Sequence, residues 1–193
     1  MTPSIERSRH AGAAAAALRP RSLSETPELV ERAIELLRTP ALLAEMDTPD
    51  LLRVASHLRL VSFRAGSRLF EEGDSSNTSY LLLMLAGEVR VVVNHVAGGD
   101  PIDLSVLGPG NVLGEMGLLD GAPRSTTCTA ITAVQAAVLT RAALDQLLEE
   151  NPRVAAKLMI ALAKRMADRL RALGEQIGIY ASIANAATTA QAN

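Results

Sequence analysis

The chain has 193 residues, of which 48% are hydrophobic, and a formal net charge of −2. This length accommodates one domain with a sizeable core plus flanking segments, and the near-neutral charge excludes a generic binder of polyanions. Since no apolar run reaches the roughly 18 residues that a membrane-spanning helix needs and no signal peptide opens the chain, we expect no membrane insertion and a cytoplasmic location. The single cysteine, Cys128, excludes an internal disulfide and any multi-cysteine metal site within one chain.

Residues 1–25 combine an alanine run with four arginines and only two acidic residues, without apolar periodicity. This composition predicts a disordered tail. An arginine-bearing, acid-poor leader is also compatible with an organelle transit peptide. The RPRSL run at 19–23 resembles a target of basophilic kinases.

N-terminal helices are predicted over residues 26–59. The TPE run at 26–28 offers an N-cap threonine, a first-turn proline and a first-turn acid, and the TPD run at 48–50 repeats this signal. Apolar residues at helical spacing follow each run, and the Thr39–Pro40 pair separates the two helices.

Over residues 60–140 the apolar pattern shortens to that of strands. Short β-branched or apolar runs alternate with turn residues, in the order LVSF, RLF, YLLLMLAGEVRVVV, DLSVL, TTCTAITA and VQAAVL. Many short strands at this spacing predict an antiparallel β-roll of jelly-roll type. The expected fold class is therefore α+β, a β-roll with N-terminal helices and a long C-terminal helix.

Helices are predicted again over residues 141–180, followed by a tail at 181–193. Thr140 can cap the first of them, and the second, over residues 152–178, carries an apolar stripe. The stripe either packs on its own roll or forms the seam of a parallel homodimer, and the length of the helix favours the homodimer. Its members lie three or four residues apart: Val154, Leu158, Leu162, Met166, Leu170, Leu173 and Ile177.

The candidate site is the GEMGLLDGAPRST run at residues 114–126, a Gly- and Pro-rich loop with one carboxylate and one guanidinium at its ends. Such a loop can aim several backbone N–H groups at one anion, while Arg124 supplies a planar fork suited to two phosphate oxygens. Glu115 is then available to accept a sugar hydroxyl. The alternative is an ordinary surface ion pair, worth about 0 to 1 kcal/mol, which the loop context disfavours.

This run resembles the cassette of the cyclic nucleotide-binding domain family, whose pattern is G-E-x-x-L followed after a gap by P-R-[STA]-[TA]. The family includes catabolite activators, kinase regulatory subunits and gated channels. The FRAGSRLFEEGD run at 63–74 and the GEVRV run at 87–91 match the opening strands of the same family.

The resemblance implies a role for each cassette residue. Arg124 should bind the exocyclic phosphate, Glu115 the ribose 2′-hydroxyl, and backbone N–H groups near Met116 the phosphate from the positive end of a short helix. Ser125 should add a backbone N–H and reach the base. The expected ligand-binding residues are Gly114, Glu115, Met116, Arg124, Ser125 and Thr126.

The expected ligand is cAMP, with cGMP as the alternative nucleotide. A serine at 125 is compatible with cAMP, whereas cGMP-selective relatives often carry threonine, which here follows at Thr126. With two Phe, two Tyr and no Trp, the chain has little with which to stack a purine. Leu173 and Gly174 replace the Thr-Ser pair that contacts adenine in catabolite activators, so Arg169 and Leu173 are the candidate lid residues.

The functional interpretation depends on which other domains or segments can be recognised beside the roll. Catabolite activators continue into a helix-turn-helix, but residues 180–193 contain no Lys or Arg, so we expect no direct DNA binding. No kinase, cyclase, phosphodiesterase or channel segment is recognisable and nothing resembles a catalytic site. We therefore expect a stand-alone cAMP sensor, not an enzyme, that signals through a separate effector protein.

Three alternatives remain. The pocket can be vestigial in a scaffold or docking protein, or the ligand can be another nucleotide such as a cyclic dinucleotide. The three histidines at 10, 57 and 95 lack the spacing of metal ligands, so no metal site is expected. A haem-binding variant of the fold through His95 stays open.

Overall fold

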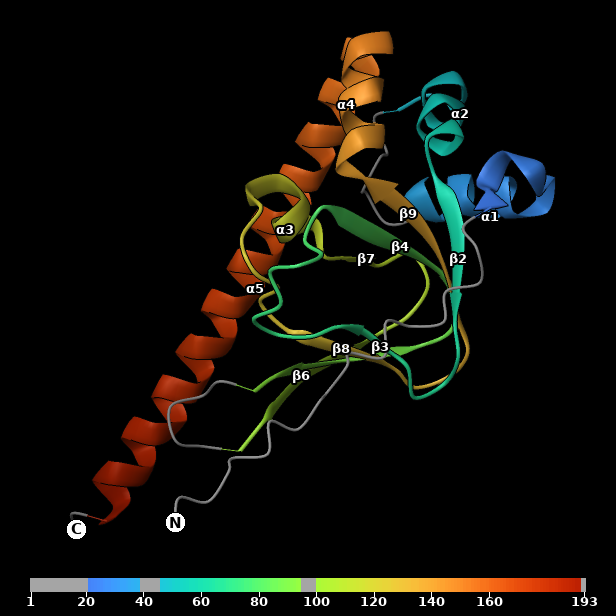
Figure 1. Cartoon of the computed structure of the whole chain (residues 1–193). Coiled ribbons are helices and arrows are strands. Elements are labelled where there is room, and N and C mark those ends of the chain that lie inside the picture. Colours follow the sequence, from blue (N-terminus) through green and yellow to red (C-terminus); the bar gives the residue numbers. More distant parts are fainter. Residues whose placement is uncertain (1–20, 39–45, 95–99, 192–193) are drawn as a thin grey trace, which may run out of the picture.

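The computed structural model describes residues 21–38, 46–94 and 100–191. Figure 1 shows two antiparallel sheets forming a roll, helices gathered over one end of it, and a long helix running along one side. The predicted α+β class, with a β-roll and a long C-terminal helix, is confirmed. Residues 1–20, with most of the predicted tail and the first two residues of the kinase-target motif, and His95 lie outside the described residues.

Regular structure is present within the part of the predicted tail that the structure describes. Residues 21–25 are predicted to be disordered, but they form a short strand followed by a 3-10 turn. The strand pairs with β2 (Arg59–Phe63), and the side chain of Leu23 is fully buried in the helical core. The N–H of Leu23 donates to the carbonyl of Leu58 at 3.2 Å. The elements of this part are β1 (Arg21–Ser22), η1 (Leu23–Glu25), α1 (Pro27–Arg38) and α2 (Thr48–Ser56).

The start of α2 shows how the local sequence sets a helix boundary. The cap residue is Asp47, one residue before the expected Thr48, because its carboxylate accepts the N–H of Asp50 at 2.8 Å. Pro49 lies in the first turn, where its missing N–H costs no hydrogen bond.

Two sheets form the roll, with strand orders β1-β2-β9-β4-β7 and β3-β8-β5-β6, and all their pairs are antiparallel. The sheets enclose one hydrophobic core, and the helices pack a second core on the outside of the first sheet. The strands are β2 (Arg59–Phe63), β3 (Arg68–Phe70), β4 (Tyr80–Ala86), β5 (Val89–Val93), β6 (Ile102–Leu107), β7 (Val112–Leu113), β8 (Thr127–Ala130) and β9 (Val134–Thr140).

Strand β4 lies between these two cores. Leu82 and Met84 face the core between the sheets, whereas Leu81, Leu83 and Leu85 face the helices. Because successive side chains of a strand point to opposite faces, a strand covered on both sides reads as one continuous apolar run. This explains the uninterrupted LLLML sequence.

A short helix, α3 (Glu115–Asp120), connects β7 to the loop before β8. Strand β7 pairs with β4 at Leu113 and Leu82, so the Gly114 turn that follows it is fixed to the edge of the sheet. The whole candidate cassette therefore lies on the rim of the roll, next to the long helix (Figure 1).

The C-terminal helices are α4 (Arg141–Glu150) and α5 (Pro152–Gln191). The predicted cap of α4 is confirmed, since the Thr140 hydroxyl accepts the N–H of Ala143 at 3.2 Å. The predicted end of the long helix is wrong: α5 continues through the expected tail at 181–193 as far as Gln191 and passes Gly174 without a break. Elongating an existing helix is easy, and the alanine-rich residues after 180 have high helix propensity.

The apolar stripe of α5 divides into two halves. Val154, Leu158 and Leu162 are buried in the core that the helices share with the first sheet, whereas Leu170 and Ile177 are 69% and 67% exposed. The first half of the stripe therefore packs on its own domain, and the second half presents apolar side chains at the surface.

Of the described helices, none has the length and apolar content that crossing a bilayer requires.

Two adjacent leucines of α2 provide a matched test of the helical core. Leu51 is fully buried and Leu52 is 48% exposed. We expect Leu51→Ala to lower the free energy of unfolding by about 2 to 5 kcal/mol, because it leaves a cavity in the core. Leu52→Ala should change it by no more than about 0.5 kcal/mol. Urea unfolding followed by circular dichroism measures both, and equal losses would contradict this assignment of the core.

Candidate functional site

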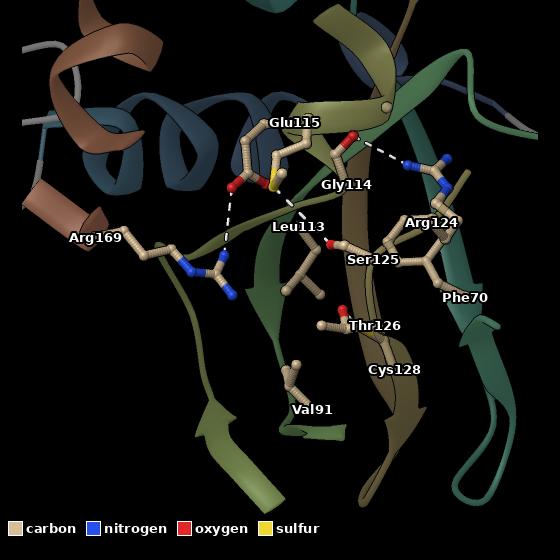
Figure 2. A pocket seen from close by; sticks show the side chains of 12 residues that line it. Phe70, Val91, Leu113, Gly114, Glu115, Arg124, Ser125, Thr126, Cys128 and Arg169 are labelled. Atoms are coloured by element: carbon tan, nitrogen blue, oxygen red, sulfur yellow. Dashed lines mark hydrogen bonds and ion pairs between the residues drawn. The ribbon is translucent and has the colours of Figure 1, made fainter. Parts of the chain in front are cut away.

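A pocket opens on the rim of the roll where α3, the strands of both sheets and α5 meet (Figure 2). It brings together all six cassette residues predicted from the sequence and Arg169, but Leu173 does not line it. Its lining consists of Phe70, Val91, Leu113, Gly114, Glu115, Met116, Gly117, Arg124, Ser125, Thr126, Cys128 and Arg169.

Arg124 is buried, with 4% of its surface exposed, and its guanidinium is held by carbonyl groups of its own chain. Nη1 donates to Gly114 O at 3.0 Å, and Nη2 donates to the carbonyls of Asn77 at 2.7 Å and Tyr80 at 3.0 Å. The guanidinium carbon also lies 4.0 Å from the ring centre of Phe70 and 4.7 Å from that of Tyr80. Cation–π contacts of this kind stabilise a desolvated arginine.

One buried nitrogen of Arg124 has no acceptor among the described residues. This nitrogen is Nε. Burial lowers the pKa of Arg124, although the group remains a cation. An unpaired buried donor costs about 1 to 3 kcal/mol, so this arginine would gain from an additional acceptor.

Glu115 is the first residue of α3 and is also buried, with 3% of its surface exposed. Its Oε1 lies 3.4 Å from Nη1 of Arg169, which comes from α5 and is partly exposed. Figure 2 shows Arg169 and Arg124 approaching the Gly114–Glu115 turn from opposite sides. The carboxylate expected to bind a sugar is therefore paired with a cation of the long helix.

A second arginine of α5 lies one turn before Arg169. Arg165 donates to Oδ1 of Asn111 at 2.8 Å, and the amide of Asn111 donates to Gly108 O at 3.0 Å. Burial lowers the pKa of Arg165, while the negative charge of Glu115 raises it. Two guanidinium groups thus connect α5 to the segment around the pocket.

The remaining lining of the pocket mixes polar and apolar side chains. The hydroxyl of Ser125 lies 3.9 Å from the sulfur of Met116, and Thr126 Oγ1 lies 3.7 Å from Cys128 Sγ. Burial raises the pKa of the Cys128 thiol. The space enclosed is about 30 Å³, whereas pockets that hold small ligands are about 300 to 1,000 Å³.

Sequence reasoning missed several lining residues. Phe70, Val91 and Cys128 lie in runs recognised only as strands. Alternation along β5 and β8 indicates which side chains face inward. It does not indicate which of them reach the rim of the roll.

The domain is similar to known proteins in sequence and in fold. A model of the cyclic nucleotide-binding domain matches residues 60–151. The structure of a cyclic nucleotide-binding domain from Methylobacillus flagellatus superposes with a TM-score of 0.71 at 30% identity, covering 78% of this chain and 83% of that one. This chain belongs to the cyclic nucleotide-binding domain family.

Two curated relatives are transcriptional regulators. The cAMP-activated global transcriptional regulator CRP of Salmonella typhimurium is 30% identical over 131 residues, which are 67% of this chain and 59% of that protein. The CRP-like cAMP-activated global transcriptional regulator of Mycobacterium tuberculosis is 26% identical over 132 residues, which are 68% of this chain and 58% of that protein. The chain therefore spans less than two thirds of the length of either regulator.

Two glycines of this cyclic nucleotide-binding domain allow the turn before α3 to be tested. Gly114 and Gly121 flank α3, and both are left-handed, with φ of 77° and 72°. A Cβ at Gly114 would lie 2.5 Å from Arg124 Nη1 and 2.8 Å from the Phe70 ring, whereas none of the described atoms lies within 4 Å of one at Gly121.

We expect Gly121→Ala to cost about 1 to 2 kcal/mol of stability through its backbone conformation alone. Gly114→Ala should cost about 1 to 3 kcal/mol more, because the added methyl collides with Arg124 and Phe70. Urea denaturation of both variants gives the difference. A Gly114→Ala protein as stable as the Gly121→Ala protein would contradict the close approach of Arg124 to this turn.

Proposed function

We propose that this domain is a cAMP sensor that regulates a separate effector protein. The observation that carries the proposal is the convergence of Glu115, Arg124 and Ser125 at one turn on the rim of the roll. The carboxylate can accept a ribose hydroxyl. The guanidinium and the first N–H groups of a helix can bind the phosphate joined to that ribose.

Arg124 is the proposed phosphate ligand. Nη1 and Nη2 now donate three hydrogen bonds to neutral carbonyls, and Nε bonds to no acceptor among the described residues. A phosphate oxygen is a stronger acceptor than a carbonyl because it is charged. A phosphate within reach would therefore compete for this guanidinium and satisfy its remaining donor.

Glu115 is the proposed partner of the ribose 2′-hydroxyl, with Gly114, Met116, Ser125 and Thr126 completing the site. The first N–H groups of α3 have no partner within their own helix, so they are available to the phosphate. Because the pocket encloses only about 30 Å³, a nucleotide enters only if side chains at its mouth move apart.

cAMP is the proposed ligand, with cGMP as the alternative. Support comes from the serine at 125 and from relatives whose names describe them as cAMP-activated. Phe70 is the one aromatic side chain among the described residues of the lining, and it stacks on Arg124. A purine would therefore contact aliphatic side chains and the arginines of α5.

A scaffold protein with a vestigial pocket is the second candidate. The observation in its favour is that Arg124 is largely satisfied by its own carbonyl groups, so the pocket is stable without a ligand. In a scaffold, binding of the effector would not depend on nucleotide.

A homodimer through α5 belongs to the same proposal. Leu170, Leu173 and Ile177 lie on one stripe of the helix and are at least 40% exposed. A second copy of the helix, packed parallel to the first, would cover this stripe.

Calorimetric titration with cAMP tests the site. We expect Arg124→Ala to weaken binding by about 2 to 5 kcal/mol, because the phosphate then loses its charged partner. Arg124→Lys should also weaken binding, since it keeps the charge but loses the planar fork.

Arg68→Ala is the matched control, because Arg68 is exposed and paired with Glu71 at 2.8 Å. Thermal melting establishes that each variant is folded. Unchanged affinity in a folded Arg124→Lys or Arg124→Ala protein would contradict the site, and absence of binding by the unmodified protein would favour the scaffold.

Sedimentation velocity tests the homodimer. We expect the double variant Leu170→Glu/Ile177→Glu to sediment as a monomer at concentrations where the unmodified protein is a dimer, because buried carboxylates would face each other across the seam. Leu148→Glu, at a 42% exposed position of α4, serves as the control and should remain dimeric. A monomeric unmodified protein would refute the homodimer.

A further inference from the structure

A second cavity, larger than the pocket on the rim, lies where β1, the end of α2 and α4 meet. Its volume is about 460 Å³, and it shares no lining residue with the rim pocket. Polar and charged side chains make up much of its lining, among them Ser22, His57, Arg59, Gln146 and Glu150. The proposed function does not use this cavity, so its polar lining needs a separate explanation.

Arg59 lines this cavity and has no partner among the described residues. Its side chain is exposed, and within the described part of the chain it makes no hydrogen bond or ion pair. The other polar groups are already engaged, since Glu150 lies 3.3 Å from Nε2 of His57 and accepts a hydrogen bond from Gln146 at 2.7 Å. Arg59 can therefore bind an anion without giving up an existing contact.

Ser22 is the residue that lies opposite Arg59. Strand β1 pairs with β2 in antiparallel register, and Ser22 is directly across from Arg59. The side chains of such a pair point to the same face of the sheet, with their Cβ atoms about 4.5 to 5.5 Å apart. A group attached to the Ser22 hydroxyl therefore lies within reach of the Arg59 guanidinium.

The sequence around Ser22 indicates which group that is. Ser22 is the serine of the RPRSL run, which resembles a target of basophilic kinases, and arginines precede it at 19 and 21. It is half-buried in a two-residue strand at the edge of the first sheet. The next residue, Leu23, is fully buried, so a kinase reaches Ser22 through local opening of this segment, which edge segments undergo more readily than a core.

We propose that Ser22 is a phosphorylation site for a basophilic serine/threonine kinase, and that Arg59 binds the resulting phosphate in this cavity. In the transfer, the Ser22 oxygen forms a bond to the γ-phosphorus of ATP while the bond from that phosphorus to the leaving ADP breaks. The hydroxyl proton passes to the kinase. This inference does not depend on the ligand of the rim pocket.

The charges of the cavity favour this phosphate at Arg59. Phosphorylation adds a charge of about −1.5 to −2 and three acceptor oxygens, and a guanidinium can bind two such oxygens at once. Glu25 and Glu150 also line the cavity. Glu25 is exposed, so water and salt screen its repulsion, and Glu150 already faces His57. The new contact would hold β1 more firmly on β2.

The first experiment treats the full chain with ATP and a basophilic kinase, the purified catalytic subunit of cAMP-dependent protein kinase. We expect phosphate on Ser22, located by mass spectrometry of peptides, and its loss in Ser22→Ala. Arg19→Gln should slow the transfer about tenfold, because the kinase loses one charged contact. An unmodified Ser22 after this treatment, or phosphate only on another serine such as Ser8 or Ser24, would overturn the modification site.

The second experiment needs no kinase. Protein with phosphoserine incorporated at position 22 by genetic-code expansion is compared with its Arg59→Gln and Arg64→Gln variants. Arg64 is the matched control, because it is exposed and also has no partner among the described residues. Circular dichroism establishes that all three proteins are folded. Phosphorus NMR then follows the second ionisation of the phosphate, whose pKa is about 6 in a free phosphoserine.

A positive charge beside the phosphate favours its dianion and so lowers this pKa. We expect the pKa to lie about 0.2 to 0.7 higher in Arg59→Gln than in the protein that keeps Arg59, and Arg64→Gln to leave it unchanged. The same pKa in all three proteins would overturn the contact with Arg59, even if the kinase does modify Ser22.

Discussion

Two opposite charges are buried on either side of the Gly114–Glu115 turn, and the need of each for a partner organises the site. Carbonyl groups and two aromatic rings surround the guanidinium of Arg124, while the carboxylate of Glu115 is paired with Arg169. A buried charge without a partner costs several kcal/mol. The turn therefore connects the interior of the roll to α5 through electrostatics as well as through the chain.

The sequence predicted the features that depend on local chemistry. Glycine and proline positions indicated the cassette, and short apolar runs separated by turn residues indicated the strands of the roll. Thr140 indicated the start of α4. The sequence did not predict which groups bond to the guanidinium of Arg124. Two of the carbonyls that hold this guanidinium belong to Asn77 and Tyr80, which are more than forty residues away in the chain. Nor did it predict that Leu23 joins the helical core, since its own segment has no apolar pattern.

The long helix shows why one periodic stripe can have two roles. Leu158 and Leu162 bury their side chains against the first sheet and the other helices, whereas Leu170 and Ile177 extend past that core with the same spacing. Periodicity indicates which face of a helix is apolar, but the shape of the domain decides where that face loses its partner. Of the two candidate lid residues, Arg169 lines the pocket and the shorter Leu173 does not.

A crystal structure of the protein with cAMP tests the central claim most directly. The account predicts the nucleotide in the pocket on the rim of the roll, with its phosphate on Arg124 and its ribose 2′-hydroxyl on Glu115. A nucleotide bound elsewhere, or one in this pocket whose phosphate leaves Arg124 on its present carbonyl partners, would contradict the account.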